Sequence, residues 1–156
     1  MDDVLCAGKD CDLQWLHDEL KKVYELTATR VGPNREMEVK YLNRTIRWTK
    51  EGLEFEGDVK HSEILVREWG MRECKTMDTP MSKEVADKLS EGKEVDEEGA
   101  RRIRRGIARV NYMAQDRPDL SVASRLLSQR MAKPTEGTEV GLKRLIRYVR
   151  AHPRCW

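Results

Sequence analysis

Three amphipathic stripes, all after residue 99, constrain the fold more than any other feature of this sequence. In each stripe apolar residues recur at helical spacing on a narrow face. The stripes are Ala100, Ile103, Ile107, Val110 and Ala114; then Leu120, Ala123, Leu127 and Met131; then Leu142, Leu145, Ile146 and Val149. Short polar breaks separate them, and Pro118 suits the first turn of the second helix. Since consecutive stripes bury themselves against one another, the sequence predicts a small helical bundle.

The first part of the chain carries strand and helix signals in alternation. An apolar run within residues 1–8 is typical of a strand that leaves a tight turn. Helical spacing follows, with Asp10 or Asp12 as the predicted N-cap and an end before the turn signal at residues 32–34. β-Forming residues in rough alternation then predict one strand over residues 37–48.

Shorter elements are predicted between this strand and the bundle. Residues 50–52 indicate a turn, after which residues 53–56 pair back as a second strand. Residues 59–69 predict a short helix that Gly70 ends. Residues 74–81 are predicted to be extended up to the proline at position 80.

Together these elements predict an α+β fold in three parts. Residues 1–81 should form a partial sheet with helices, residues 82–98 a charged linker with one weak helix, and residues 99–156 an all-helical region. A chain of 156 residues suffices for one domain or two small lobes with a buried core.

Charge is distributed unevenly although the net charge is only +2. Residues 101–156 hold 14 lysines and arginines against 4 aspartates and glutamates. A basic half favours a polyanionic partner such as nucleic acid, and an ordinary solvated surface is the alternative.

Several features bear on where the protein works. No apolar run reaches the roughly 18 residues that cross a bilayer, and no signal-peptide pattern opens the chain. The four cysteines form no C-x-x-C pair, so free thiols in a reducing compartment are expected. We therefore expect an intracellular protein, cytoplasmic or nuclear, without a membrane partner.

Asp2 and Asp3 are the first candidate site. Adjacent carboxylates at a strand turn suit Mg²⁺, which prefers oxygen ligands and serves phosphoryl transfer. A solvated acidic chain end is the alternative interpretation.

Two basic helices supply the second candidate site. Arginines lie away from the apolar stripe of the first helix, where Arg104, Ala108 and Tyr112 stand in line at four-residue spacing. A small residue allows close approach of a partner, and an aromatic ring outside the stripe can contact a sugar or base. The face of the final helix opposite its stripe carries Lys143, Arg144, Arg147 and Arg150. The alternative is two solvated faces, with Tyr112 packed on a neighbouring lobe.

Several ordered motifs connect these pieces. They are Met1 to Gly8 with the Asp-Asp pair; Tyr41-Leu42-Asn43-Arg44-Thr45-Ile46; Cys74-Lys75 through Thr79-Pro80-Met81; Asn111 to Ser121 with Arg117-Pro118-Asp119; Lys133-Pro134-Thr135; and Lys143-Arg144-Leu145-Ile146-Arg147-Tyr148. This set resembles the back end of reverse transcriptases of the copia retrotransposon type, and the resemblance covers nearly the whole chain.

The resemblance implies roles for particular residues. Asp2 and Asp3 would be the paired metal-site aspartates of the palm, with Asp2 the better direct ligand of Mg²⁺. Leu42 and Asn43 would lie in the hairpin that grips the primer, where Asn43 replaces a common glycine. The helices after residue 98 would be the thumb along the template–primer duplex. In related retroviral enzymes the row that matches Arg104, Ala108 and Tyr112 follows the minor groove of the duplex. Helix-face spacing adds further nucleic-acid-binding candidates: Arg101, Arg105, Arg109, Lys143 and Arg147.

The family pattern also contains parts that this chain does not show. The third catalytic aspartate and the fingers precede the position of Met1 in the family, and a ribonuclease H domain follows the thumb. We therefore expect the chain to be a polyprotein fragment, inactive alone as an RNA-directed DNA polymerase. A non-catalytic nucleic-acid-binding module and a decayed element remnant are the alternatives.

Overall fold

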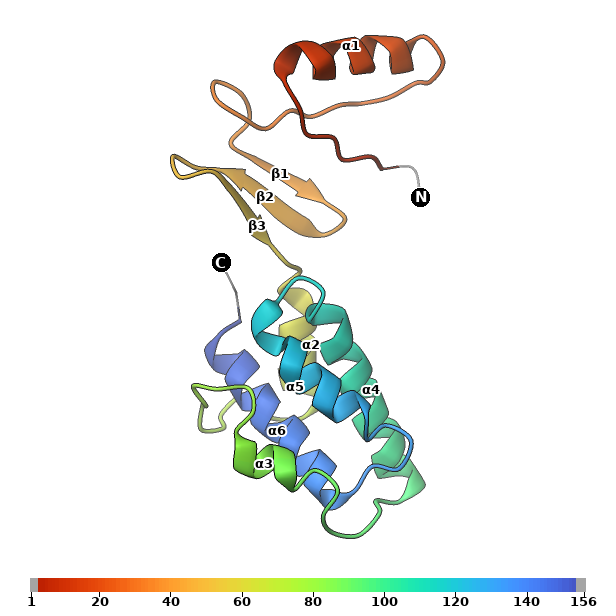
Figure 1. Cartoon of the computed structure of the whole chain (residues 1–156), viewed down its shortest axis with the longest axis vertical. Helices are drawn as coiled ribbons and strands as arrows, with labels where there is room; N and C mark the ends of the chain where they lie inside the picture. Colours follow the sequence, from red (N-terminus) through yellow and green to blue (C-terminus); the bar gives the residue numbers. More distant parts are fainter. Residues whose placement is uncertain (1–2, 154–156) are drawn as a thin grey trace. The chain divides into compact units, whose positions relative to one another are not determined.

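The computed structural model describes residues 3–153 and has the predicted α+β fold. Its described residues divide between Glu56 and Gly57 into an N-terminal unit and a helical unit (Figure 1). The N-terminal unit holds α1 (Asp10–Lys21), β1 (Glu38–Tyr41), β2 (Arg44–Trp48) and β3 (Leu53–Glu56). The helical unit holds α2 (Lys60–Glu68), α3 (Lys83–Asp87), α4 (Glu97–Met113), α5 (Pro118–Ser128) and α6 (Glu136–Ala151).

The three strands form an antiparallel meander in the order β1-β2-β3. The predicted turn after Trp48 and the strand β3 are confirmed. The prediction of one strand over residues 37–48 is wrong, because the chain reverses at Leu42 and Asn43. Both residues have positive φ, 49° and 64°, as a two-residue type I′ hairpin turn requires. Strand periodicity did not indicate this turn, since Leu42 is an unusual residue for that conformation.

The start of the chain differs from its prediction in two ways. Residues 3–9 form no strand, and Val4 and Leu5 are exposed, because no described strand pairs with their backbone. The predicted N-cap of α1 is also wrong. Lys9 occupies the cap without a side-chain hydrogen bond, and Asp10 and Asp12 lie in the first turn. In the first turn their carboxylates interact favourably with the positive end of the helix dipole, but they do not cap the helix.

Local signals place the helices of the helical unit where the sequence predicted them. The Asp96 side chain accepts a hydrogen bond from the Gly99 amide (2.9 Å) and begins α4. Pro118 stands at the first turn of α5. Thr135 and Thr138 form a capping box at the start of α6. Each cap satisfies amides that have no partner inside the helix, which explains why these boundaries were predictable.

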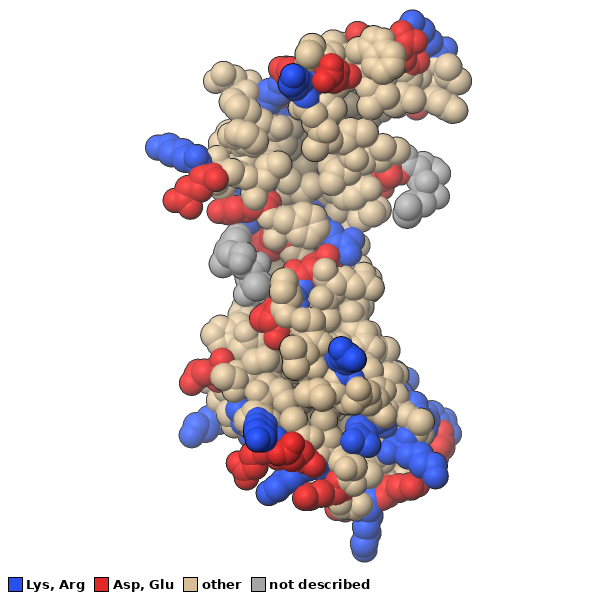
Figure 2. Space-filling view, viewed as in Figure 1, with Lys and Arg blue, Asp and Glu red and all other residues tan. Residues whose placement is uncertain are grey.

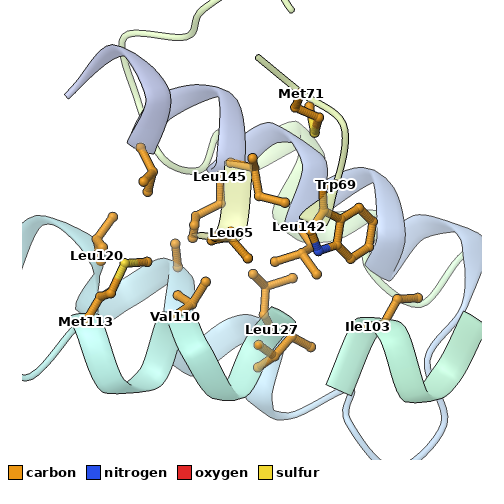
Figure 3. Close-up of a cluster of buried hydrophobic side chains, with 14 of the residues drawn as sticks. Leu65, Trp69, Met71, Ile103, Val110, Met113, Leu120, Leu127, Leu142 and Leu145 are labelled. Atoms are coloured by element: carbon orange, nitrogen blue, oxygen red, sulfur yellow. The ribbon is translucent and has the colours of Figure 1, made fainter. Parts of the chain in front are cut away.

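The apolar stripes of α4, α5 and α6 meet in one core, which α2 completes. Figure 3 shows Leu65 and Trp69 from the α2 region among the side chains of the other helices. Leu65, Ile107, Leu120, Leu142 and Leu145 are fully buried. The α4 stripe also includes Met113, which is buried, whereas Ala114 at the end of the helix is half-buried and packs against the same core.

Packing groups α2 and α3 with the C-terminal helices, although both precede residue 99. The division into residues 1–81, 82–98 and 99–156 was based on functional parts and stays a prediction. No helix in residues 3–153 is long and apolar enough to cross a membrane.

Candidate nucleic-acid interface

Helix α4 contacts α2, α5 and α6, and one row of its residues faces solvent. We call this row, Arg101, Arg105, Ala108 and Tyr112, the α4 row. Arg101, Arg105 and Ala108 are exposed, and Tyr112 is half-buried one turn further on. At 100° per residue these four positions fall within a narrow sector opposite the buried stripe. Arg101 is 73% exposed and meets Glu97 at 3.4 Å, whereas Arg105 makes no hydrogen bond or ion pair with residues 3–153. The row therefore presents two guanidinium groups, a small residue and an aromatic ring.

Arg104 is directed toward the end of α5. Its Nε donates to the carbonyl oxygen of Met131 (2.9 Å) and its second terminal nitrogen donates to that of Ala132 (3.2 Å). The predicted line of Arg104, Ala108 and Tyr112 is thus present on the helix, but the Arg104 guanidinium already satisfies carbonyl groups beyond α5. Contact between these residues and nucleic acid stays a prediction.

Arg109 and Tyr112 lie on the side of α4 that faces α2. Arg109 is only 19% exposed; it donates toward His61 Nδ1 (3.3 Å) and to the Glu68 carboxylate (3.2 Å). The Tyr112 ring lies 4.4 Å from the His61 ring at an interplanar angle of 48°. Tyr112 thus packs against α2 of the same helical unit while it remains partly exposed. His61 was not predicted to belong to any site.

The basic face of α6 is partly covered by the segment at residues 74–79. Arg150 donates to the Cys74 carbonyl oxygen, and Arg144 donates to the Thr79 hydroxyl at 2.9 Å. Lys143 pairs with Glu139 at 2.7 Å. Arg147 is half-buried, and its Nε has no hydrogen-bond partner among the described residues. The helix therefore uses part of its positive charge to hold the chain that crosses it.

The surface charge of the helical unit is mixed on the side that Figure 2 shows. Basic and acidic side chains lie next to one another there, so that side carries no uniformly positive patch. The arrangement of the α4 row, more than net charge, therefore defines the candidate interface.

The remaining candidate residues belong to the N-terminal unit. Leu42 and Asn43 form the tip of the β1–β2 hairpin, and Leu42 is exposed. Asp3 is exposed, and its carbonyl oxygen accepts a hydrogen bond from the Tyr41 hydroxyl (3.4 Å). Asp2 lies outside the described residues. Residues 3–153 contain no group of three or more histidines, cysteines, aspartates or glutamates that could hold a metal. The Asp2 and Asp3 site for Mg²⁺ stays a prediction.

A buried ion pair joins two of the motifs on which the family resemblance rests. Arg117, 7% exposed, forms two hydrogen bonds to the Asp119 carboxylate, at 3.2 and 2.5 Å. The Tyr148 hydroxyl of α6 donates to the same carboxylate (2.9 Å), and Arg117 also donates to the His152 carbonyl oxygen (2.6 Å). Burial by itself would raise the Asp119 pKa. The hydrogen bonds and charge of Arg117, with the Tyr148 hydroxyl, outweigh it, so the pKa lies below its ordinary value.

This ion pair explains the Arg-Pro-Asp segment as a structural element. It ties the start of α5 to the end of α6, which are adjacent in space and some thirty residues apart in sequence. Nothing in the spacing of Arg117 and Tyr148 indicated that they meet.

Comparison with known proteins identifies a relative of this chain. The chain is 33% identical over 110 residues to the "Uncharacterized mitochondrial protein AtMg00810" of Arabidopsis thaliana. The match covers 70% of this chain and 44% of that protein, so the chain spans less than half of its relative's length. No protein-family model matches the sequence, and no solved structure matches it.

Proposed function

We propose that this chain is the C-terminal palm-and-thumb part of a copia-type retrotransposon reverse transcriptase, an RNA-directed DNA polymerase, and that its helical unit holds the template–primer duplex. The observation that carries the proposal is the solvent-facing row of α4. Arg101 and Arg105 offer charge to phosphates, Ala108 admits close approach, and Tyr112 offers a ring to a sugar or base. The ordered motifs support the polymerase family, and the fully packed core keeps the row rigid.

We also propose that the chain binds Mg²⁺ and works together with the other parts of the polyprotein. Asp2 and Asp3 would contribute carboxylates to a metal site that neutralises charge during phosphoryl transfer. Residues 3–153 alone do not make such a site, because Asp3 is exposed and no three potential ligand side chains gather among these residues. No catalytic step is therefore assigned to the metal, and the fingers and ribonuclease H parts would belong to other segments of the polyprotein.

Duplex binding is tested by charge reversal on the α4 row. The full chain is titrated into a labelled RNA–DNA hybrid and a DNA duplex of equal length, from 50 to 200 mM salt. Arg101→Glu with Arg105→Glu should weaken binding and reduce the magnitude of the salt slope by about 2, roughly one for each phosphate that is no longer neutralised. Arg104 is left unchanged, because its replacement would also remove hydrogen bonds to the Met131 and Ala132 carbonyls.

A matched control reverses the same number of charges elsewhere on the helical unit. Lys83→Glu with Lys93→Glu alters two exposed lysines near α3 and should leave the salt slope unchanged. If the two double variants bind alike, with equal slopes, the α4 row is not the interface.

A polymerase fragment and a non-catalytic binding module are both expected to bind a duplex. The complete sequence of the encoding transcript separates them. The polymerase proposal requires an open frame that encodes a further palm aspartate and a nucleotide-binding part upstream in the same polyprotein. A transcript without them would leave the binding module as the function.

A further inference from the structure

We infer that His61 is a positioning residue of the α4 row, which holds the Tyr112 ring in the orientation that a nucleic-acid duplex contacts. This inference rests on the proposed function and adds to it a residue of α2 that neither sequence spacing nor motif indicated. His61 would act through Tyr112 and would not itself touch the duplex.

The His61 ring is held from three sides. Its Nδ1 lies 3.3 Å from a terminal nitrogen of Arg109, and its Nε2 lies 3.8 Å from the Asp58 carboxylate. The ring also packs against Tyr112, at a centroid distance of 4.4 Å and a tilt of 48°. The His61 side chain is 28% exposed, so most of its surface is covered.

The chemistry of these partners sets the direction of the contacts. A guanidinium group can only donate, so Nδ1 is the acceptor in the contact with Arg109. The Asp58 carboxylate lies near Nε2, at a distance longer than a hydrogen bond. The ring is thereby placed between two charged groups, beside Tyr112.

Arg109 is fixed in turn by α2. Its other terminal nitrogen donates to Glu68 (3.2 Å), and its Nε is buried without a hydrogen-bond partner among the described residues. Glu68, Arg109 and His61 therefore form a connected support from α2 to the edge of the α4 row. This support restricts the rotation of Tyr112 before any partner binds.

Restriction of Tyr112 has a defined consequence for binding. A side chain that is already ordered loses less conformational freedom when a ligand contacts it, so affinity rises without a new contact. Loss of the His61 ring should therefore weaken duplex binding by about 3- to 10-fold. Because His61 contacts no phosphate in this proposal, the salt slope should stay constant.

The experiment is a double-mutant cycle on the full chain, with the labelled RNA–DNA hybrid as the probe. His61→Ala should weaken binding as stated, and His61→Phe, which restores a ring beside Tyr112 but not the acceptor for Arg109, should restore affinity at least in part. Tyr112→Ala should weaken binding by about 10-fold or more, because it removes the aromatic ring that meets a sugar or base. His61→Ala should have no further effect in the Tyr112→Ala background, because its action passes through that ring.

His152 provides a matched control, since its ring also packs on a tyrosine. It lies 4.7 Å from Tyr148 at the end of α6, and no ring contact joins it to Tyr112 among the described residues. His152→Ala keeps the backbone carbonyl that accepts from Arg117 and should leave duplex affinity unchanged. Thermal unfolding of each variant checks that loss of binding is not loss of fold.

The outcomes separate this inference from the proposed function. If reversal of Arg101 and Arg105 weakens binding but His61→Ala does not, only the role of His61 is overturned. Additive effects of His61→Ala and Tyr112→Ala, or failure of His61→Phe to restore affinity, also overturn it. If the unaltered chain binds neither duplex, the proposed function falls and this inference falls with it.

Discussion

Helices α1 and α6 carry apolar residues at similar spacing, yet only one of them buries its stripe among the described residues. In α6, Leu142, Leu145, Ile146 and Val149 are fully buried against other helices. In α1 no residue is buried, and Trp15 is largely exposed. A stripe at 3.6-residue period thus predicts a helix in both cases, but burial depends on whether other stripes are available to cover it.

The same contrast extends to the polar contacts of the two units. In the helical unit the Arg117–Asp119 pair is largely withdrawn from solvent and tied to Tyr148. In the N-terminal unit the Arg35–Asp10 pair has a similarly short distance, 2.6 Å, but both side chains are exposed. A similar separation therefore has unequal consequences for stability, because solvent screens the second pair.

The largest test of this comparison truncates one leucine in each stripe. Leu142→Ala removes a fully buried side chain and should lower the free energy of unfolding by about 4 kcal/mol, since a cavity remains. Leu16→Ala affects a half-buried residue of α1 and should cost much less. Urea unfolding, with hydrogen exchange to assign each transition to a unit, measures both. Equal losses would show that α1 is packed as tightly as α6.

Glycines provide the second test. A Cβ at Gly137 would overlap the Lys88 carbonyl oxygen, which is backbone and cannot move aside. Gly137→Ala should therefore cost about 3 kcal/mol, at the upper end for overpacking. A Cβ at Gly32 in the N-terminal unit meets nothing within 4 Å. Gly32→Ala should leave stability unchanged or raise it by up to about 1 kcal/mol. If the urea midpoint falls for Gly32→Ala as well as for Gly137→Ala, the expected difference between the two glycines is wrong.

The two ion pairs provide the third test. Arg117→Ala leaves the Asp119 carboxylate with Tyr148 as its remaining partner on α6. A fully buried pair broken in this way costs about 3–5 kcal/mol, and we expect about 2 kcal/mol because the Asp119 side chain remains 21% exposed. Arg35→Ala should have little or no effect on unfolding. Calorimetry of both variants at neutral pH measures the difference in stability. A larger loss of stability for Arg35→Ala would show that the exposed pair contributes more than the buried one.

The pH dependence of the Asp119 contribution follows from its lowered pKa. The folded protein holds the Asp119 pKa below the ordinary value of 3.8, so the carboxylate stabilises the fold above that pH. The contribution is lost as pH falls through the folded pKa. Asp119→Asn should therefore be less stable than the unaltered chain between pH 5 and 7, and the gap should narrow below about pH 4. A gap that is constant from pH 7 to pH 3 would exclude a role for the ionised carboxylate.

The helical unit was more predictable from sequence than the N-terminal unit for a physical reason. Its helices are specified twice, by stripes such as Leu142 to Val149 and by local caps such as Asp96 and Thr135. The strand predicted for residues 1–8 had only local β-propensity, which is realised when a neighbouring strand supplies hydrogen bonds. Residues 3–9 pair with no described strand and therefore form none.

The candidate site was predictable as a helix face but not as a set of contacts. Spacing alone placed Arg101, Arg105 and Ala108 on the solvent side of α4. It could not show that Arg104 reaches the carbonyls beyond α5 or that His61 lies beside Tyr112. Those contacts join residues 27 and 51 positions apart and depend on how the helices pack.

The hairpin of the N-terminal unit offers the smallest and most informative change. Leu42 and Asn43 both adopt left-handed backbone conformations, which cost energy for residues other than glycine and are more tolerable for asparagine. Leu42→Asn with Asn43→Gly supplies the preferred residues of a type I′ turn and should stabilise the sheet by about 1 kcal/mol. Hydrogen exchange of β1 and β2 amides measures this gain. If the exposed Leu42 also contacts a primer, as the family resemblance implies, the same variant should bind the duplex more weakly while its sheet is more stable. Increased stability with unchanged binding would show that the strained turn serves only to reverse the chain, and would leave α4 as the duplex-binding surface in the described residues.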